Sequence, residues 1–573
     1  MVPSLLSAAT CISLIETSFS SDGNSGLSAG TEAYVNQHPV IVGTGPLSPA
    51  DVVAVARYGA QVDLDPAALA AMAVSRSVID SLVDDGTPHY GVSTGFGALA
   101  TKHIPLDQRS QLQRSLIRSH AASSGAEVDR EVVRALMLNR LSTLATGRTG
   151  VRPLVGTTYA ALLNAGITPV IGEYGSLGCS GDLAPLSHIA LALMGEGTVR
   201  TRDGQLVPAA EALAAAGIAP VELREKEGLA LINGTDGMLG MLVLASADLH
   251  RLLTMADLAA AMSVEGLLGT DAVFAEDLHA LRPHPGQISS AATIRALLEG
   301  SPLIAEQLTS ETGRHRFTRV QDAYSLRCAP QVHGAARATL AHAESVAAVE
   351  LGSAIDNPVI TPDGRIESNG NFHGAPVGYV LDFLAIAVAD VASMSERRTD
   401  RFLDKTRNHG LNAFLAHDPG VDSGHMIAQY TQAGIVSELK RLANPASVDS
   451  IPSSAMQEDH VSMGWAAGLK LRKAIDGLTR VLAIEILTAA RALDMRDGGA
   501  SPGTPAPTGD APAPSGGMRS SVPINAVRAR LRQDVEGPGT DRYLAPEIEA
   551  ARLLVDDGSL LAAALGVLPA PLQ

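Results

Sequence analysis

Residues 175–188 read Gly-Ser-Leu-Gly-Cys-Ser-Gly-Asp-Leu-Ala-Pro-Leu-Ser-His, and the Cys179-Ser180-Gly181 step inside them can form a cofactor from the backbone. If the amide nitrogen of Gly181 attacks the carbonyl carbon of Cys179 and water leaves, a five-membered ring closes. Loss of a second water from Ser180 leaves an exocyclic methylidene group. The product is 4-methylidene-imidazol-5-one (MIO), an electrophile made without a metal or an external cofactor.

Each position of this triplet has its own chemical requirement. Glycine is needed third, because a Cβ would crowd the approach of its nitrogen to the chain. Serine is needed second, because its hydroxyl is eliminated, whereas the first residue supplies only a carbonyl. A bare Xaa-Ser-Gly is usually only a turn, so the triplet needs support from the rest of the sequence.

Further segments give that support. In chain order they are Tyr-Gly-Val-Ser-Thr-Gly-Phe-Gly (90–97), Asn-Gly-Thr (233–235), Gln-Asp-Ala-Tyr-Ser-Leu-Arg-Cys (321–328), Gly-Asn-Phe-His (370–373) and Ser-Ser-Ala-Met-Gln-Glu-Asp-His-Val-Ser-Met (453–463). Together with residues 175–188, they resemble the MIO-dependent aromatic amino-acid ammonia-lyase and aminomutase family over residues 40–495. Within that family, the sequence is most similar to those of the histidine-specific members from actinobacteria.

Composition agrees with this resemblance but does not produce it. The chain has 573 residues, of which 46% are apolar, so it is long enough for a large core. Its net charge is -17, and the sequence contains no block of like charges. We therefore expect neither nucleic acid nor a membrane surface as a partner, because both select for clustered Lys and Arg.

The cysteines and the apolar segments bear on location. Three cysteines, Cys11, Cys179 and Cys328, make no disulfide framework, which favours a reducing compartment and a cytoplasmic protein. The first 20 residues have no Lys or Arg before Leu5-Leu6 and so lack the charged start of a secretory signal. We find no uncharged apolar stretch long enough to span a bilayer.

The chain divides into five regions by composition. We expect a mobile N-terminal extension (1–38), a MIO-bearing catalytic region (39–235), a central long-helix bundle (236–497), a disordered Pro/Gly-rich insertion (498–521) and a C-terminal helical tail (522–573). Helical periodicity is clearest over 461–495 and recurs over 383–404 and 428–443.

Periodicity alone supports a mostly helical protein. The resemblance implies more: a mainly α fold with a long-helix bundle of the fumarase/aspartase-like type and a smaller N-terminal MIO-bearing region. It also implies a homotetramer in which each active site takes residues from more than one subunit.

Two tyrosines are candidates for the base that removes the β-proton. By resemblance, Tyr90 lies in a mobile loop and takes this proton, and Tyr324 could assist or exchange roles with it; the sequence leaves both assignments open. A lone tyrosine is more often a packing residue, and its usual pKa near 10 requires nearby positive charge for such a role.

Four more residues match substrate-contacting positions of the family. The planar guanidinium of Arg327 suits the α-carboxylate of an amino acid, although an arginine is more often found in a salt bridge. Asn233 and Gln321 can supply neutral hydrogen bonds to the MIO oxygen, the substrate carboxylate or the amine, and Phe372 would pack against MIO or the substrate ring. Without the resemblance, Asn233 would be read as a turn residue and Phe372 as part of the core.

Two positions indicate the substrate. Ser119-His120 occupies the selectivity position of the family, where phenylalanine lyases have Phe-Leu and tyrosine lyases have His-Leu. Glu458 supplies a carboxylate that can hold an imidazole N–H but would be a desolvation burden opposite a phenyl ring. Both residues favour L-histidine, with trans-urocanate and ammonia as products. A structural ion pair between His120 and Glu458 is the alternative.

Two departures and several alternatives remain. Cys179 replaces the alanine common at the first MIO position, and Met456 stands where many histidine-specific members have Asn. The same residues could serve a 2,3-aminomutase, whereas Ser119-His120 disfavours a phenylalanine or tyrosine lyase. A catalytically silent helical scaffold and a fumarase-like lyase are the remaining hypotheses. No metal site is expected.

Overall fold

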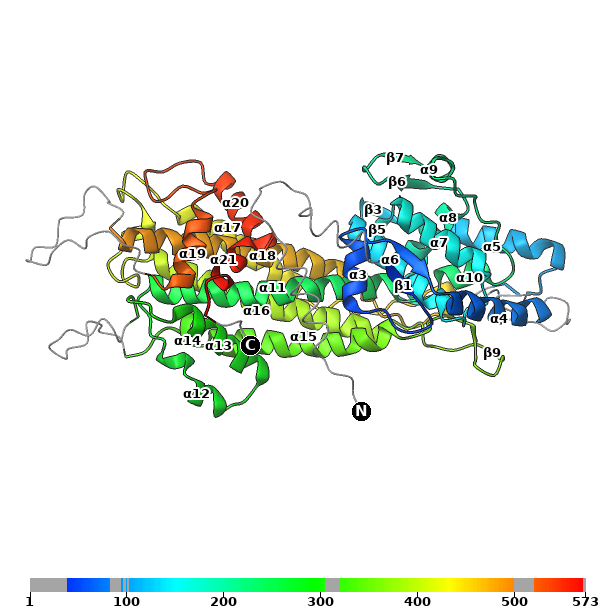
Figure 1. Ribbon diagram of the computed structural model, residues 1–573, viewed down its shortest axis with the longest axis horizontal. Helices are drawn as coiled ribbons and strands as arrows, with labels where there is room; N and C mark the ends of the chain where they lie inside the picture. Colours follow the sequence, from blue (N-terminus) through cyan, green and yellow to red (C-terminus); the bar gives the residue numbers. More distant parts are fainter. Residues whose placement is uncertain are drawn as a thin grey trace, which may run out of the picture. The chain divides into compact units, whose positions relative to one another are not determined.

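The computed structural model describes residues 39–82, 94–95, 99, 102–304, 320–498 and 520–569 of the chain. This part is mainly helical, and its strands are only two to four residues long (Figure 1). The expected mainly α fold is therefore confirmed. The proposed extension (1–38), most of the proposed insertion (498–521) and Tyr90 lie outside the described residues.

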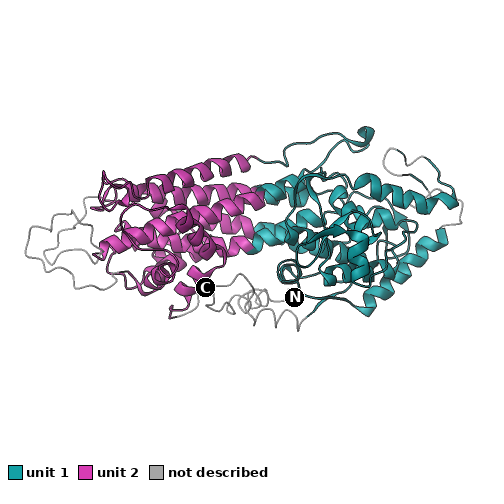
Figure 2. Cartoon of the chain, turned by 90° about the horizontal axis from the view of Figure 1, so that it is seen from above, with its two compact units in different colours: residues 1–247, 342–382, 445–470 teal, residues 248–341, 383–444, 471–573 magenta. Residues whose placement is uncertain are grey.

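The chain forms two compact units (Figure 2). Unit 1 contains residues 1–247, 342–382 and 445–470, and unit 2 contains residues 248–341, 383–444 and 471–573. Four long helices have residues in both units: α11 (Asp236–Gly266), α15 (Ala329–Leu351), α16 (Ala375–Leu403) and α18 (Gly464–Arg496). Because these helices pass from one unit to the other, each unit is built from three separate segments, whereas the regions proposed from composition are contiguous.

Unit 1 combines short helices with small sheets. Its helices are α3 (Pro49–Ala56), α4 (Pro66–Leu82), α5 (Leu106–His120), α6 (Arg130–Ala145), α7 (Pro153–Ala165), α8 (Leu183–Leu193), α9 (Ala209–Ala215) and α10 (Glu227–Ile232), with the 3-10 turn η4 (Ser454–Met456). Its strands are β1 (Val40–Val42), β2 (Val62–Leu64), β3 (Ser124–Glu127), β4 (Thr168–Pro169), β5 (Gly172–Tyr174), β6 (Thr198–Arg200), β7 (Leu206–Pro208), β8 (Val359–Ile360) and β9 (Ile366–Glu367).

The strands pair locally. β1 pairs with β2 in parallel, while β3 with β5 and β8 with β9 are antiparallel pairs, and β4, β6 and β7 form a three-stranded antiparallel sheet in that order. Helix α6 lies in the interior, since 14 of its 16 residues are buried. Its polar side chains, including Arg134 and Arg140, must therefore find partners inside unit 1, and both do so.

Unit 2 is almost entirely helical. Its remaining elements are η2 (Ala272–Phe274), α12 (Glu276–Ala280), α13 (Pro285–Leu298), α14 (Tyr324–Arg327), η3 (Ala413–Leu415), α17 (Met426–Leu442), α19 (Val522–Leu531), α20 (Ala545–Asp556) and α21 (Ser559–Leu565). The helices predicted over 461–495, 383–404 and 428–443 correspond to α18, α16 and α17 and are confirmed; α16 begins eight residues earlier than predicted.

Two sets of buried polar contacts connect elements of unit 2. Arg398 and Glu485 form a fully buried ion pair with Nε–Oε1 at 2.5 Å, and the Ser263 hydroxyl donates to the same carboxylate at 2.6 Å. Ser521 caps α19 and also donates to the Leu297 carbonyl at 2.6 Å. The last residues of the proposed insertion are thus packed into the fold.

Two described helices are long and apolar enough to cross a membrane by length and composition. They are α11 and α16, and 78% and 61% of their most apolar windows are buried within the protein. The core helix of a globular fold meets the same criterion.

Candidate functional site

The loop that carries the MIO triplet connects β5 to α8 in unit 1. Gly181 has φ of +77°, in the left-handed region that favours glycine. It forms a parallel bridge with Gly234, and the next amide, from Asp182, donates to the Gly234 carbonyl at 2.7 Å. A Cβ on Gly181 would overlap the Gly234 backbone. The left-handed φ and the close approach of Gly234 therefore favour glycine here, independently of the chemistry of ring closure.

The other flank of the loop rests on residues 462–463. The Met463 amide donates to the Leu177 carbonyl at 2.9 Å, and the Ser462 hydroxyl donates to the Gly178 carbonyl at 3.2 Å. The loop is therefore fixed on both sides of the triplet. Such anchoring favours an intramolecular reaction, because the reacting backbone atoms have little freedom to move apart.

Asp182 links this loop to α11, and sequence reasoning missed it. Its fully buried carboxylate accepts from the amides of Gly237 and Met238 at 2.8 and 3.0 Å and from the Ser176 hydroxyl at 3.0 Å. These amides belong to the first turn of α11, where backbone N–H groups lack helical partners. Burial raises the pKa of Asp182 to about 7. The feature of the sequence that could have identified Asp182 is its position directly after the triplet.

Asn233 follows α10 and is 2% exposed. Its Nδ2 donates to the Asn357 carbonyl at 2.8 Å, and its own carbonyl accepts from Arg140 Nη1 at 3.2 Å. Its Oδ1 is buried and has no hydrogen-bond partner among the described residues. Since a buried polar atom without a partner is costly, this atom marks where a polar group of a cofactor or substrate would fit.

His120 ends α5, and its ring orientation is set locally. Its Nδ1 lies 2.9 Å from the Leu116 carbonyl and 3.0 Å from the Ser119 hydroxyl. A carbonyl can only accept, so Nδ1 carries the hydrogen, and in the neutral ring Nε2 is an acceptor. Burial lowers the pKa of His120, although the Leu116 carbonyl and the charge of Glu458 oppose this shift. His120 is therefore neutral near pH 7.

Glu458 is half-buried and accepts a hydrogen bond from the Ser453 hydroxyl at 3.0 Å. Its charge influences both His120 and Cys179: burial, followed by the Glu458 carboxylate, raises the pKa of the Cys179 thiol to about 12. Among the described residues, Glu458 acts on His120 through its charge and not through a direct side-chain hydrogen bond. The structure thus brings the two residues that indicate the substrate together with the first residue of the triplet.

Phe372 and Met456 differ in their surroundings. Phe372 is half-buried, and the ring of the next residue, His373, stacks on His460 with centroids 5.6 Å apart. This contact brings the 370–373 segment to the segment that contains Glu458. Met456 is 67% exposed, in accordance with a side chain that offers no strong hydrogen bond.

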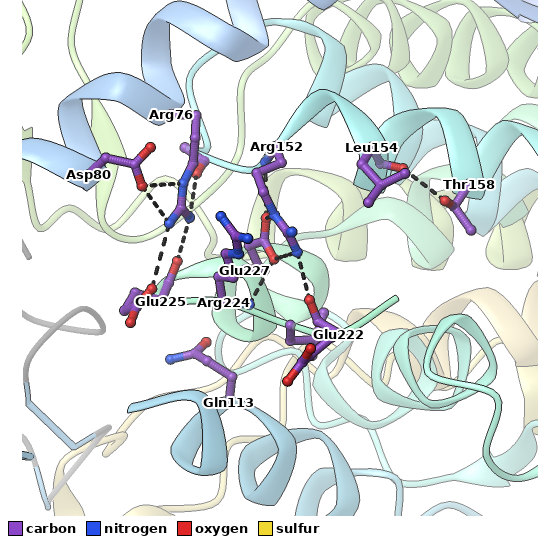
Figure 3. A network of polar contacts seen from close by, with 12 residues as sticks. Arg76, Asp80, Gln113, Arg152, Leu154, Thr158, Glu222, Arg224, Glu225 and Glu227 are labelled. Atoms are coloured by element: carbon purple, nitrogen blue, oxygen red, sulfur yellow. Dashed lines mark hydrogen bonds and ion pairs between the residues drawn. The ribbon is translucent and has the colours of Figure 1, made fainter. Parts of the chain in front are cut away.

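A polar network holds the turn that precedes α10 (Figure 3). The fully buried carboxylate of Glu227 accepts from the Arg152 backbone amide at 3.0 Å and from its Nε and Nη2, both at 2.8 Å. Arg76 of α4 donates to the Glu225 carbonyl at 2.8 Å. Lys226 has φ of +71° and forms a buried pair with Asp356, with Nζ–Oδ2 at 2.5 Å.

The same turn positions α5. The Gln113 Oε1 accepts from the Gly228 amide at 2.9 Å, and Gln113 is fully buried. Since α5 ends at His120 and α10 leads into Asn233, this turn connects two candidate site residues. No sequence motif marked Gln113, Arg152 or Glu227 as part of such a network.

The remaining candidates lie in unit 2. Gln321 is exposed, Tyr324 is 69% exposed and Arg327 is half-buried. The Arg327 Nε donates to the Asp322 carbonyl at 3.0 Å, and its guanidinium lies over the Tyr324 ring at 4.5 Å. The hydrogen bond uses Nε, so the two terminal nitrogens that would bind a carboxylate take no part in it.

Unit 2 also fixes the short helix that carries Tyr324 and Arg327. The buried Arg398 donates from Nη1 to the Ser325 carbonyl at 3.2 Å, and the Asp322 carboxylate accepts from the Thr270 amide at 2.9 Å. The segment is therefore held at two points, while the side chain of Tyr324 is exposed.

The residues of unit 1 fit a MIO group at 179–181. Gly181 has a left-handed φ that favours glycine, Ser180 is half-buried, and Asn233 brings a buried polar atom without a partner to the segment that is bridged to Gly181. In the described ranges, no group of three or more His, Cys, Asp or Glu side chains could hold a metal ion.

The family model described as aromatic amino acid lyase matches residues 47–511. The histidine ammonia-lyase of Streptomyces coelicolor is 62% identical over 532 residues, which is 92% of this chain and 99% of that protein.

Solved structures of two related enzymes are also similar to this chain over most of its length. The tyrosine aminomutase from Streptomyces globisporus superposes with a TM-score of 0.84 at 36% identity, covering 94% of this chain and all of that one. The histidine ammonia-lyase from Trypanosoma cruzi superposes with a TM-score of 0.81 at 35% identity, covering 93% of this chain and 96% of that one.

Proposed function

This chain belongs to the aromatic amino acid lyase family, whose members cleave carbon–nitrogen bonds, and we propose that it converts L-histidine to trans-urocanate and ammonia. This reaction would be the first step of histidine degradation. The similarity to a histidine ammonia-lyase over almost the whole of both chains supports the proposal.

The arrangement of His120 and Glu458 carries the substrate assignment. The hydrogen on Nδ1 leaves Nε2 of His120 as an acceptor, and Glu458 is an acceptor with a negative charge. The imidazole of histidine can donate an N–H to such a site, whereas a phenyl ring has no donor to offer. Burial of two acceptors against a phenyl ring would cost free energy without a compensating hydrogen bond.

We propose that Cys179, Ser180 and Gly181 form MIO without an external cofactor. The fixed flanks of the loop and the bridge between Gly181 and Gly234 support this ring closure. MIO supplies an electrophilic carbon to which the substrate amine can be joined, which makes the amine a better leaving group.

The other candidates take roles that follow from their chemistry. Arg327 would bind the α-carboxylate, Gln321 would supply a neutral hydrogen bond, and Phe372 would pack against the substrate. The unpartnered Oδ1 of Asn233 would accept a hydrogen bond from the substrate amine. Tyr90 is proposed to take the β-proton. Tyr324 is the second candidate for this role, and the Arg327 guanidinium lies over its ring, 4.5 Å from the ring centroid.

We further propose a homotetramer with shared active sites. Gln321, Tyr324 and Arg327 belong to unit 2, whereas the triplet, His120 and Glu458 belong to unit 1. In the assembly that the family resemblance implies, unit 2 of one subunit would complete the site of another. The cytoplasmic location and the absence of nucleic-acid or membrane partners remain predictions.

Incubation of the purified chain with L-histidine, L-phenylalanine and L-tyrosine tests the function. We expect the conjugated acrylate urocanate from histidine, little product from the other two, and no turnover after Ser180→Ala. The similarity to a tyrosine aminomutase makes a 2,3-aminomutase the second candidate. A β-amino acid as the main product would show that outcome, and absence of any product would favour a silent scaffold.

A further inference from the structure

A pocket of about 330 Å³ opens on unit 1 and contains none of the candidate site residues. Four arginines line it: Arg57, Arg130, Arg134 and Arg202. Glu131 is the one carboxylate on its wall among the described residues. The volume is within the range of pockets that bind small molecules.

The pocket wall carries an excess of positive charge. Glu131 is paired with Arg57, with Nε–Oε2 at 2.6 Å, so it neutralises one of the four guanidinium groups. The hydrogen bonds of the other three arginines go to backbone carbonyls, which are dipoles and cancel no net charge. This local excess contrasts with the net charge of -17 on the whole chain.

The arginines repel one another. Burial, followed by the charges of Arg130 and Arg202, lowers the pKa of Arg134 to about 10. Burial and the charge of Arg202 also lower the pKa of Arg130. An anion with more than one negative charge would relieve this repulsion, and a site at the surface would admit it from solvent.

The positive groups are already held in place. Arg134 donates to the Val55 carbonyl at the end of α3 and to the Leu163 carbonyl near the end of α7. Arg202 donates from Nη2 to the Asn164 carbonyl at 2.6 Å. Ordering long side chains before binding reduces the entropy that a ligand must overcome.

Donor atoms also remain for a ligand. Arg130 uses Nη1 and Nη2 for the carbonyls of Arg202 and Gly166, and Arg202 uses Nη2 for Asn164. The Nε of both arginines and Nη1 of Arg202 take no part in these bonds. Guanidinium groups match the geometry of phosphate oxygens, because they offer several donors in one plane.

We propose that this pocket binds a small phosphate-bearing anion. Tyr58 also lines the pocket. The volume exceeds that of inorganic phosphate alone, so an organic phosphate would fill the pocket better. Its binding would hold the ends of α3 and α7 and the turn between β6 and β7 together.

Equilibrium dialysis of the full chain tests the proposal, with inorganic phosphate and adenosine monophosphate as separate probes. We expect one saturable phosphate per chain, and an Arg202→Gln variant that binds at least roughly tenfold more weakly. Arg200→Gln is the matched control: it removes the same charge from the same hairpin, but Arg200 is paired with Glu127 and does not line the pocket. Tighter binding of adenosine monophosphate than of phosphate would identify an organic phosphate as the source.

Three results would overturn the proposal. The first is the absence of saturable phosphate binding at about 0.1 M salt, where exposed charges are strongly screened. The second is an equal loss of binding in Arg202→Gln and Arg200→Gln. The third is a loss of phosphate binding in Arg327→Gln, because the anion would then occupy the proposed carboxylate site in unit 2.

Discussion

Gly181 and Gly234 lie backbone against backbone, joined by a parallel bridge, so that a side chain on either residue would collide with its surroundings. A Cβ on Gly181 would overlap the Gly234 backbone, and a Cβ on Gly234 would overlap the Arg140 guanidinium. Arg140 is itself fully buried and paired with Asp236. The proposed ring-forming triplet is therefore built against a rigid wall of unit 1.

Gly181→Ala is expected to prevent ring formation. An L-residue in the left-handed region costs roughly 1–2 kcal/mol, and here the added Cβ also meets backbone that cannot move aside. The intact mass of the variant should equal that of the encoded chain, whereas the natural protein should be lighter by two waters. Gly204→Ala is the control, since Gly204 has φ of +84° but nothing within 4 Å of an added Cβ. A Gly181→Ala protein that still loses two waters would contradict this explanation.

Glu458→Gln should lower turnover of histidine more than roughly tenfold, about 1.4 kcal/mol of transition-state stabilisation. Glutamine keeps an acceptor oxygen but removes the charge that can orient an imidazole N–H. Steady-state kinetics with L-histidine give the measurement, and Asp459→Asn, at the exposed neighbouring position, is the matched control. Equal kcat/KM in the two variants would show that the Glu458 charge does not select the substrate.

The pKa of Asp182 predicts a pH-dependent stability. Its folded value, about 7, exceeds the ordinary 3.8, so the folded chain binds a proton more readily than the unfolded chain. This contribution is complete below pH 3.8 and is lost as pH rises through 7, by at most ~4 kcal/mol. Asp182→Asn resembles the protonated form and should lack this loss.

Urea unfolding at pH 5 and pH 8 measures the effect of Asp182. The natural protein should lose more stability than Asp182→Asn between these two pH values, at a fixed protein concentration. A difference between the two proteins that does not change with pH would mean that Asp182 remains ionised when folded. The three hydrogen bonds to its carboxylate would then outweigh burial.

The sequence predicted a mostly helical protein and three of its helices because both depend on local patterns, whereas the long helices α11 and α15 were not located individually. The 3.6-residue period of apolar side chains located α16, α17 and α18, and the segment around Cys179 located the candidate site. The sequence did not reveal Asp182 as a buried carboxylate or Gln113 as a contact between helices. Each depends on partners distant in sequence, such as Gly237 and Gly228, which no local period encodes.

Gln113→Leu should weaken substrate binding without preventing ring formation. The change leaves the buried Gly228 amide without its acceptor, at a cost of about 1–3 kcal/mol, and loosens α5 against α10. KM for histidine should rise several-fold because α5 carries His120, while the intact mass should still be two waters below the encoded value. Gln111→Leu is the control on the exposed face of the same helix. Loss of the mass change in Gln113→Leu would indicate a general folding defect instead.

Mixing two inactive variants should restore activity if active sites are shared between subunits. Ser180→Ala removes a group of unit 1, and Arg327→Gln removes a group of unit 2, so each homotetramer alone should be inactive. When both chains are unfolded and refolded together, random assembly should give roughly a quarter of the sites an intact Ser180 and an intact Arg327 from different subunits. Turnover of histidine by the mixture should therefore approach that fraction of the natural activity. A Ser180→Ala and Arg327→Gln double variant, refolded with itself, is the control and should stay inactive. If the mixture is as inactive as this control, each site takes Ser180 and Arg327 from the same chain, and the proposed sharing of sites is wrong.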